Sequence, residues 1–180
     1  MEIIRAEQIN HFKQPAVVTV GSFDGVHRGH QALLEVARTE ADRLGGVVVV
    51  VTFDPHPRIA LGRTEGFKQL TNNDEKAARL AQHGVDYLVM MPFNRETAGE
   101  TGENFARRFL QGILNAKVIV AGYNHRFGCD RLDPTQLTID GLRVVQVPPV
   151  IHNGEQVSST RIRNLLAEGK TDQAQELMGL

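Results

Sequence analysis

Short apolar runs alternate with helical patterns along most of the chain. The first run, Ala16–Val20, is rich in β-branched residues and leads directly into a glycine-containing segment, Gly21–Gly25. From Gln31 to Leu44 the apolar residues recur every three or four positions, which predicts an amphipathic helix. The next run, Val47–Phe53, shows no apolar–polar alternation. Because a strand that is apolar on both faces is typical of the middle of a parallel sheet, the pattern predicts a strand, a glycine loop, a helix and a buried strand.

The same alternation continues through the rest of the chain, with candidate N-cap residues before the helices and glycines after them. Two stretches, 54–66 and 128–141, have no regular pattern, and the first is interpreted as a functional loop. The order of elements predicts an α/β fold with a doubly wound parallel sheet, in which ligands bind beyond the carboxyl ends of the strands where the winding reverses. The remaining predicted elements are a helix from the caps Thr71–Asp74 through Gln82, a strand at Tyr87–Met91, a helix from Gly102 or Glu103 through Leu114, strands at Val118–Ala121 and Arg143–Val147, a helical pattern through Leu166 and a helical segment at Thr171–Met178.

The composition is that of a single globular domain. With 180 residues, of which 41% are hydrophobic and 23% charged, the chain is long enough to bury a sizeable core, and we expect residues 1–180 to form one domain. It has no apolar run of about 18 residues and no secretory leader pattern, so the cytoplasm is the expected location. A net charge of -1 gives no bulk attraction to nucleic acid or to a membrane. The single cysteine, Cys129, is expected to be a solvated or half-buried thiol.

The most informative segment runs from Gly21 to His30 and combines a glycine turn after a strand with two histidines at the start of a helix. His27 and His30 are three residues apart, so in a helical turn both rings can face the same way. Gly29 removes a side chain where a phosphate must approach, and a helix N-terminus offers unpaired N–H groups and a positive dipole. The pattern predicts a cradle for the triphosphate of a nucleotide.

A second anion-binding pattern lies near the end of the chain. Ser158, Ser159 and Thr160 precede a helical pattern, where hydroxyl groups serve both as N-caps and as anion ligands. One hydroxyl is enough for capping. The others, together with the guanidinium fork of Arg163, indicate phosphate binding. Arg161 in the same segment is interpreted equally well as a phosphate ligand or as a solvated charge.

Two further segments follow predicted strands and therefore fall at the same edge of the sheet. Thr52–Arg58 holds His56 between two prolines, which stiffen the backbone. Such a histidine is more often structural, but its place at the end of a strand favours a ligand site. Gly122–Gly128 follows the strand at 118–121, and the amide of Asn124 can hold a nucleotide hydroxyl or a phosphate oxygen without adding a charge that repels ATP. The alternative for Asn124 is a simple turn residue.

These four segments resemble, in order, the motifs of one enzyme superfamily. His27-Arg28-Gly29-His30 resembles the His-x-Gly-His signature of nucleotidyltransferases, and the longer string with Gly21 and Phe23-Asp24-Gly25 resembles their flavin-adenylating branch. The 158–163 segment resembles the Ser-Ser-Thr-x-x-Arg element, the 52–58 segment the flavin-side loop, and the 122–128 segment a Gly-x-Asn/Asp-x-x-Phe-Gly element. The chain is thus similar to the FMN adenylyltransferase (FAD synthetase) domain of the bifunctional riboflavin kinase/FAD synthetase family.

The resemblance implies a Rossmann-like nucleotidyltransferase domain that transfers AMP from ATP to FMN, giving FAD and pyrophosphate. It also implies a set of site residues, each at a position that matches a motif. The expected catalytic residues are His27, His30, Asn124 and Arg163; the expected ATP-binding residues are Gly21, Phe23, Gly25, Gly29, Ser158, Ser159 and Thr160; the expected FMN-binding residues are Asp54, Pro55, His56, Pro57 and Arg58.

Magnesium is expected to arrive with the nucleotide as MgATP. Because Mg²⁺ keeps several waters and takes few protein ligands, no metal ligand from the protein is predicted. The expected partners are the small molecules ATP and FMN, with neither nucleic acid nor a membrane. Two departures from the family are noted: the 129–141 stretch is shorter than the usual loop and helix, and no riboflavin kinase domain is expected in this chain.

Other functions stay open at this point. Within the same fold the acceptor can be nicotinamide mononucleotide or phosphopantetheine, or CTP can replace ATP in a cytidylyl transfer; the 53–58 loop favours FMN. From a different class, the chain can be a nucleotide-binding regulatory module without turnover, which the short 129–141 stretch motivates. An RNA-binding role is disfavoured, because there is no basic stripe with interleaved aromatic residues and no tryptophan.

Overall fold

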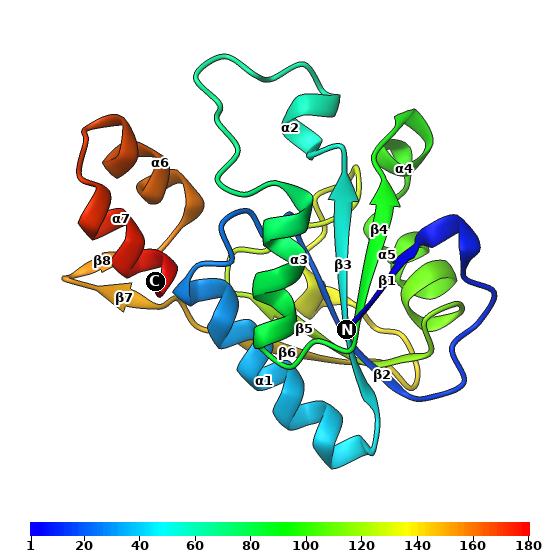
Figure 1. Cartoon of the computed structure of the whole chain (residues 1–180). Helices are drawn as coiled ribbons and strands as arrows, with labels where there is room; N and C mark the ends of the chain where they lie inside the picture. Colours follow the sequence, from blue (N-terminus) through cyan, green and yellow to red (C-terminus); the bar gives the residue numbers. More distant parts are fainter.

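A six-stranded parallel sheet forms the centre of the molecule. The computed structural model describes residues 1–180, and the strands lie in the order β1-β4-β3-β2-β5-β6 (Figure 1). The strands are β1 (Glu2–Arg5), β2 (Ala16–Val20), β3 (Val47–Asp54), β4 (Tyr87–Pro92), β5 (Ala116–Gly122) and β6 (Arg143–Val147). All pairings within the sheet are parallel. The predicted doubly wound α/β fold is therefore confirmed.

Helices cover both faces of the sheet because successive residues of a buried strand point to opposite sides. On one face, Val17 packs with residues of α1 (Arg28–Leu44) and α3 (Asn73–Gln82) in one apolar cluster. On the other face, Val18 belongs to a cluster that includes α5 (Gly102–Phe105) and the π-helical turns η2 (Ala106–Gln111). Burial on both faces explains the continuous apolar runs in the sequence.

The winding reverses between β2 and β5. From β2 the chain adds β3 and then β4 on one side, and it returns to place β5 against the other side of β2. The loops that follow β2 and β5 therefore start side by side at the carboxyl end of the sheet and run in opposite directions. These two loops carry the glycine segment and the Gly122–Gly128 segment, so the predicted site residues meet where open α/β sheets bind ligands.

The last thirty residues form a small unit at one side of the sheet (orange to red in Figure 1). It consists of a hairpin, β7 (Ile151–His152) and β8 (Glu155–Gln156), followed by α6 (Ser159–Ala167) and α7 (Thr171–Met178). The unit has its own buried cluster, which includes Ile162 and Leu177. It is fastened to the start of α1, since the side chains of Arg28 and Gln31 donate to the carbonyls of Glu176 (2.7 Å) and Met178 (3.0 Å).

Most long elements were predicted with bounds that differ by a few residues, and the short ones were missed. The predicted 102–114 helix ends earlier and becomes π-helical after Phe105. Strand β1 was missed because it has only four residues, but it pairs with β4 at the sheet edge. The predicted loop at 54–66 contains the single-turn helix α2. The other short elements are α2 (Pro57–Ala60), α4 (Arg95–Gly99) and the 3-10 turns η1 (Ala6–Gln8) and η3 (Pro134–Gln136).

No helix in the structure is both long enough and apolar enough to cross a bilayer.

Candidate active site

A cavity of about 310 Å³ opens at the carboxyl ends of β2, β5 and β6. Its walls come from the glycine loop and first turns of α1, from the loop after β5, and from the segment that leads into α6. Nine of the predicted catalytic and ATP-binding residues line it: Gly21, Phe23, His27, Gly29, His30, Asn124, Ser158, Ser159 and Thr160. Residues that are more than 130 positions apart in the sequence thus share one cavity.

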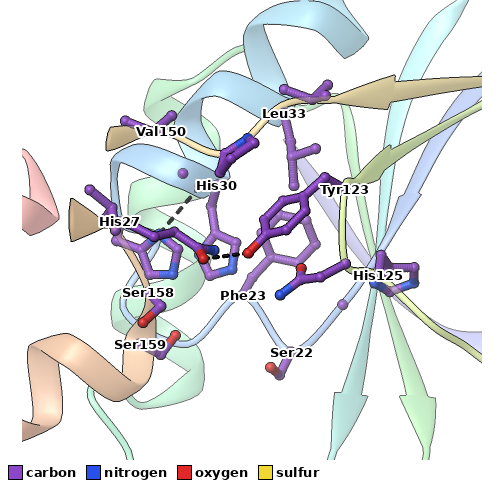
Figure 2. A pocket seen from close by; sticks show the side chains of 18 of the residues that line it. Ser22, Phe23, His27, His30, Leu33, Tyr123, His125, Val150, Ser158 and Ser159 are labelled. Carbon is purple, nitrogen blue, oxygen red and sulfur yellow. Dashed lines mark hydrogen bonds between the residues drawn. The ribbon is translucent and has the colours of Figure 1, made fainter. Parts of the chain in front are cut away.

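The two histidines form a stacked pair at the N-terminus of α1. Their ring centroids are 3.7 Å apart and the planes differ by 15° (Figure 2). His27 is the N-cap: its Nδ1 accepts a hydrogen bond from the backbone N–H of His30 at 3.4 Å. This contact assigns the proton of the neutral ring to Nε2, so His27 retains one N–H donor for a ligand.

Burial keeps both rings neutral. Desolvation lowers the pKa of His27 to about 4. The pKa of His30 lies well below 6.5, mainly because of burial and secondarily because a proton on His27 and the charge of Lys76 each oppose a proton on His30. At neutral pH the pair therefore offers hydrogen-bond donors without a positive charge.

Gly29 leaves room for the ring of His27 at the start of α1. A Cβ atom at this position would lie 3.2 Å from the ring of His27 and 3.6 Å from the carbonyl oxygen of Val157. The sequence predicts a glycine here because a side chain would block the approach of a phosphate. Its surroundings add a second reason, because a side chain at this position would crowd the ring of His27.

The hydroxyl groups at the start of α6 make different contacts. Ser158 is the N-cap and accepts from the N–H of Arg161 at 3.2 Å, whereas Ser159 donates to the carbonyl oxygen of Asp24 at 3.0 Å. Thr160 is exposed at the cavity. Arg161 is not a solvated charge: its guanidinium donates to the carbonyls of the β7–β8 hairpin and pairs with Glu155.

Asp24 joins three segments beneath the cavity. It is 1% exposed, and its Oδ1 accepts from the N–H groups of Leu70 (2.8 Å) and Thr71 (3.1 Å). Its Oδ2 forms an ion pair with Arg163 of α6. Around it the glycine loop holds strained backbone, with φ of 48° at Phe23 and 42° at Val26. Such conformations persist only where the surroundings enforce them.

Arg163 is the one predicted catalytic residue that does not line the cavity. Besides Asp24, its guanidinium binds the carbonyl of Lys68 at 2.8 Å and lies over the ring of Phe67, 4.6 Å from the centroid. Gly25 also stays outside the cavity wall, with φ of 86° and its N–H donated to Thr71. Neither residue is therefore placed to contact a ligand in the first cavity.

A second cavity, of about 230 Å³, lies beside the first at the ends of β3 and β4. Aromatic side chains make up much of its wall: Phe53, Phe93, Phe105 and Phe127. Of the five residues predicted to bind FMN, only Pro57 lines this cavity; Asp54, Pro55, His56 and Arg58 do not. His56 caps α2 through Nδ1 at 3.1 Å from the N–H of Arg58, and burial lowers its pKa.

The two cavities share Val20 and His125. Sequence reasoning passed over His125, because the motif specifies its neighbour Asn124 and leaves position 125 open. Burial lowers the pKa of His125 to about 4, and its Nε2 has no hydrogen-bond partner. A buried polar atom without a partner is unusual in a folded protein and is a signal that only the structure can give.

Tyr123 and Gln156, which both line the first cavity, form a hydrogen bond, and Figure 2 shows Tyr123 beside His30. Tyr123 comes from the loop after β5 and Gln156 from β8, so this contact joins two opposite walls. The amide of Asn124, next to Tyr123, makes no hydrogen bond within the chain and is free for a ligand.

The electrostatics of the first cavity come from dipoles rather than from ions. No Asp, Glu, Lys or Arg lines it, and its histidines are neutral. The N-termini of α1, with 17 residues, and α6, with 9 residues, both face it. Two converging helix termini with hydroxyl donors suit a polyphosphate. At the other end Leu33, Pro148 and Val150 provide an apolar wall suited to a base.

The fold and the site together define a nucleotidyltransferase-like domain with a Rossmann-like parallel sheet. The chain belongs to the FAD synthetase family, whose model matches residues 9–161.

Relatives from two bacteria match almost the whole chain. The FAD synthetase of Listeria monocytogenes is 35% identical over 176 residues, which cover 94% of this chain and 71% of that protein. The bifunctional riboflavin kinase/FMN adenylyltransferase of Escherichia coli is 33% identical over 172 residues, covering 93% of this chain and 55% of that protein. The chain thus spans about half the length of several bifunctional relatives, including those of Escherichia coli and Pseudomonas fluorescens.

Solved structures show the same architecture. A crystal structure described as a macrolide-efflux protein from Streptococcus pneumoniae has a TM-score of 0.90 at 34% identity and covers 99% of this chain and 62% of that one. Pantoate-beta-alanine ligase from Francisella tularensis, at 18% identity and a TM-score of 0.59, covers 98% of this chain and 86% of its own, and it shares the fold alone.

The Asp24–Arg163 pair should be strongly coupled. Breaking a buried ion pair leaves one charge unpaired, so D24N and R163M should each lower the free energy of unfolding by about 3–5 kcal/mol, with a smaller loss in the double variant than the sum. Urea denaturation of the four proteins measures this. R38M provides the control, because the Arg38–Asp86 pair is partly exposed and should contribute about 1 kcal/mol or less. Additive effects of D24N and R163M would show that the two residues act independently.

The free energy of unfolding should fall as the pH decreases from about 6.5 to about 4. Folded His27 and His125 have a pKa of about 4, against 6.5 for an ordinary histidine, so the unfolded chain binds more protons in this window. The loss for His27 is about 3 kcal/mol, at about 1.4 kcal/mol for each unit. Urea midpoints measured at several pH values test this. H125F should make the decline shallower, while H11Q at an exposed position should not.

Proposed function

We propose that this chain transfers AMP from ATP to FMN, giving FAD and pyrophosphate. The observation that carries the proposal is the shared wall of the two cavities: one suits a nucleotide triphosphate, the other has aromatic walls, and Val20 and His125 border both. An enzyme that joins two nucleotides must hold them against each other at the reacting atoms. Membership of the FAD synthetase family and relatives named FMN adenylyltransferase support the same reaction.

In this proposal ATP occupies the first cavity. Its β- and γ-phosphates lie at the start of α6, where Ser158, Ser159 and Thr160 are gathered, and its adenine lies at the apolar end near Leu33 and Val150. The absence of carboxylates from the lining favours a tetra-anionic ligand, because no like charge has to be overcome.

The aromatic cavity receives the flavin of FMN. Phe53 and Phe93 pack edge to face with centroids 5.4 Å apart, which leaves a firm apolar wall for a flat ring system. The Asp54–Arg58 loop borders this cavity through Pro57, and the lining also holds one acidic and one basic residue, Glu100 and Arg126. Among phosphate-bearing acceptors, this lining favours one with a large aromatic ring over phosphopantetheine.

The reaction itself requires positioning more than acid–base chemistry. An oxygen of the FMN phosphate attacks the α-phosphorus of ATP, and the bond from that phosphorus to the bridging oxygen breaks, so that pyrophosphate leaves with the electron pair. No proton has to move, because the attacking oxygen is already anionic. His27 and His30, at the α1 terminus, donate hydrogen bonds to the charge that develops on the α-phosphate, and Asn124 holds a further oxygen.

In this proposal Arg163 acts indirectly, through Asp24, and does not contact the substrates. Through Asp24 it fixes the start of α6 against the glycine loop, and it thereby sets the distance between the two helix termini that hold the phosphates. Gly25 contributes in the same way, through Thr71.

Magnesium would come with ATP. No three His, Cys, Asp or Glu side chains gather into a metal site, and the carboxylate of Asp24 is already occupied by Leu70, Thr71 and Arg163. These residues fit an ion held by phosphate oxygens and water rather than by the protein. When bound, Mg²⁺ neutralises phosphate charge.

Pyrophosphate release from MgATP should depend on FMN, and the product should have the mass of FAD. Riboflavin, which has the flavin ring but no phosphate, is the matched control and should release none. Turnover with nicotinamide mononucleotide or phosphopantetheine but not with FMN would reassign the acceptor. ATP binding without any pyrophosphate release would favour a regulatory nucleotide-binding module and contradict the proposal.

Replacing either histidine should slow turnover. H27A and H30A should each reduce kcat by about 10²-fold or more, the effect of losing one preorganised donor to the developing charge. H83A is the control, because His83 ends α3 outside both cavities and its loss should leave kcat unchanged. Unchanged turnover in both H27A and H30A would refute their assignment.

A further inference from the structure

Lys76 is a buried cation that the mechanism above leaves unused. It lies on α3, beside α1 on one face of the sheet (Figure 1), and it is only 1% exposed. Lysine is almost never buried to this extent unless its charge is compensated. Lys76 lines neither cavity, so it is not placed to touch a ligand directly.

Its ammonium group is linked to the glycine loop through one hydroxyl. Nζ donates to Oγ1 of Thr52 at 3.3 Å, and this hydroxyl donates to the carbonyl oxygen of Ser22 at 3.2 Å. Thr52 is fully buried near the end of β3, and Ser22 lines the first cavity. The chain of contacts therefore runs from α3, through β3, to the wall that holds the proposed nucleotide.

Two carboxylates act on the same ammonium group. Burial lowers the pKa of Lys76, whereas the charges of Asp24 and Asp54 raise it. Asp24 belongs to the glycine loop, and Asp54 ends β3 at the start of the proposed flavin loop. The positive charge is thus influenced by one carboxylate from each ligand loop.

We infer that Lys76 is a positioning residue for the adenylyl transfer, holding the Ser22 carbonyl through Thr52 and balancing Asp24 and Asp54 so that the two ligand loops keep a fixed relation. The inference rests on the proposed function, because it concerns how the two substrates are brought together. A shift of about 1 Å between reacting groups can reduce a rate by about 10²-fold.

The charge of Lys76 also acts on two histidines of the site. The pKa of His30 is lowered first by burial, then by His27 and then by the charge of Lys76. The same charge lowers the pKa of His56 as well, which burial, Arg163 and Arg58 also lower and Asp24 raises. Removing the ammonium should therefore raise both pKa values, because protonation would no longer be opposed by a neighbouring positive charge.

The test compares K76M, which removes the charge, with K76R, which keeps it. K76M should lower kcat by about 10²-fold with a smaller change in the KM for ATP, and the acid limb of its pH profile should move to higher pH. K76R should recover most of the rate and the wild-type profile. R38M, which loses an ion pair at the far end of α1, should behave as the wild type.

A second readout does not depend on turnover. The ring signals of His30 and His56, followed by NMR against pH, should titrate at higher pH in K76M and at wild-type pH in K76R. T52V breaks the hydroxyl link but keeps the charge, so it should lower kcat without moving these titrations; it also serves if K76M fails to fold. Wild-type kcat and wild-type titrations in K76M would overturn the inference.

The two proposals can fail separately. If the wild-type chain makes no FAD but K76M still shifts the histidine titrations, the proposed function is wrong and the electrostatic link of Lys76 to the site stands. If the wild type makes FAD and K76M matches it in kcat, pH profile and titrations, the function stands and the role of Lys76 is refuted.

Discussion

The buried carboxylate of Asp24 is the interaction on which the site depends. It holds the 70–71 backbone with one oxygen and the guanidinium of Arg163 with the other, while its own carbonyl accepts from Ser159. The glycine loop around it carries positive φ at residues with side chains, which costs about 1–3 kcal/mol for each. Without these contacts the loop would relax, and the termini of α1 and α6 would no longer face each other across one cavity.

Neutral groups and dipoles supply the attraction for a polyphosphate. Charged side chains in the lining would lose their bound water when a ligand enters. They would also have to move as charge shifts along the ligand during the reaction. The N–H groups of a helix terminus need no such movement, because the backbone holds them in place. The charged groups Asp24, Lys76 and Arg163 lie one layer beneath. There Asp24 pairs with Arg163 and Lys76 binds Thr52, and these contacts hold the uncharged donors above them in place. Burial keeps the two histidines above them neutral, and the charge of Lys76 adds to this effect at His30.

The sequence was sufficient for the doubly wound sheet and for nine of the residues around the first cavity, because apolar runs report burial on both faces and local motifs report loops after strands. The sequence did not predict the contacts of residues whose role depends on the direction in which the side chain points. The Arg163 guanidinium points to Asp24 and not into the cavity, and Arg161 fastens a hairpin of two-residue strands that no periodicity reveals. His125 stands out because its Nε2 is buried without a hydrogen-bond partner, and Lys76 because its side chain is buried. Both properties depend on the tertiary structure and leave no pattern in the sequence.

The common wall formed by Val20 and His125 has a consequence for how a reaction cycle would end. Each substrate can leave by giving up the contacts of one cavity, but a product that spans the wall keeps the contacts of both. Its two halves are tethered, so when one detaches the other holds it close and recapture is fast. In a domain built this way, the escape of the dinucleotide, rather than bond formation, is expected to limit the pace of the cycle.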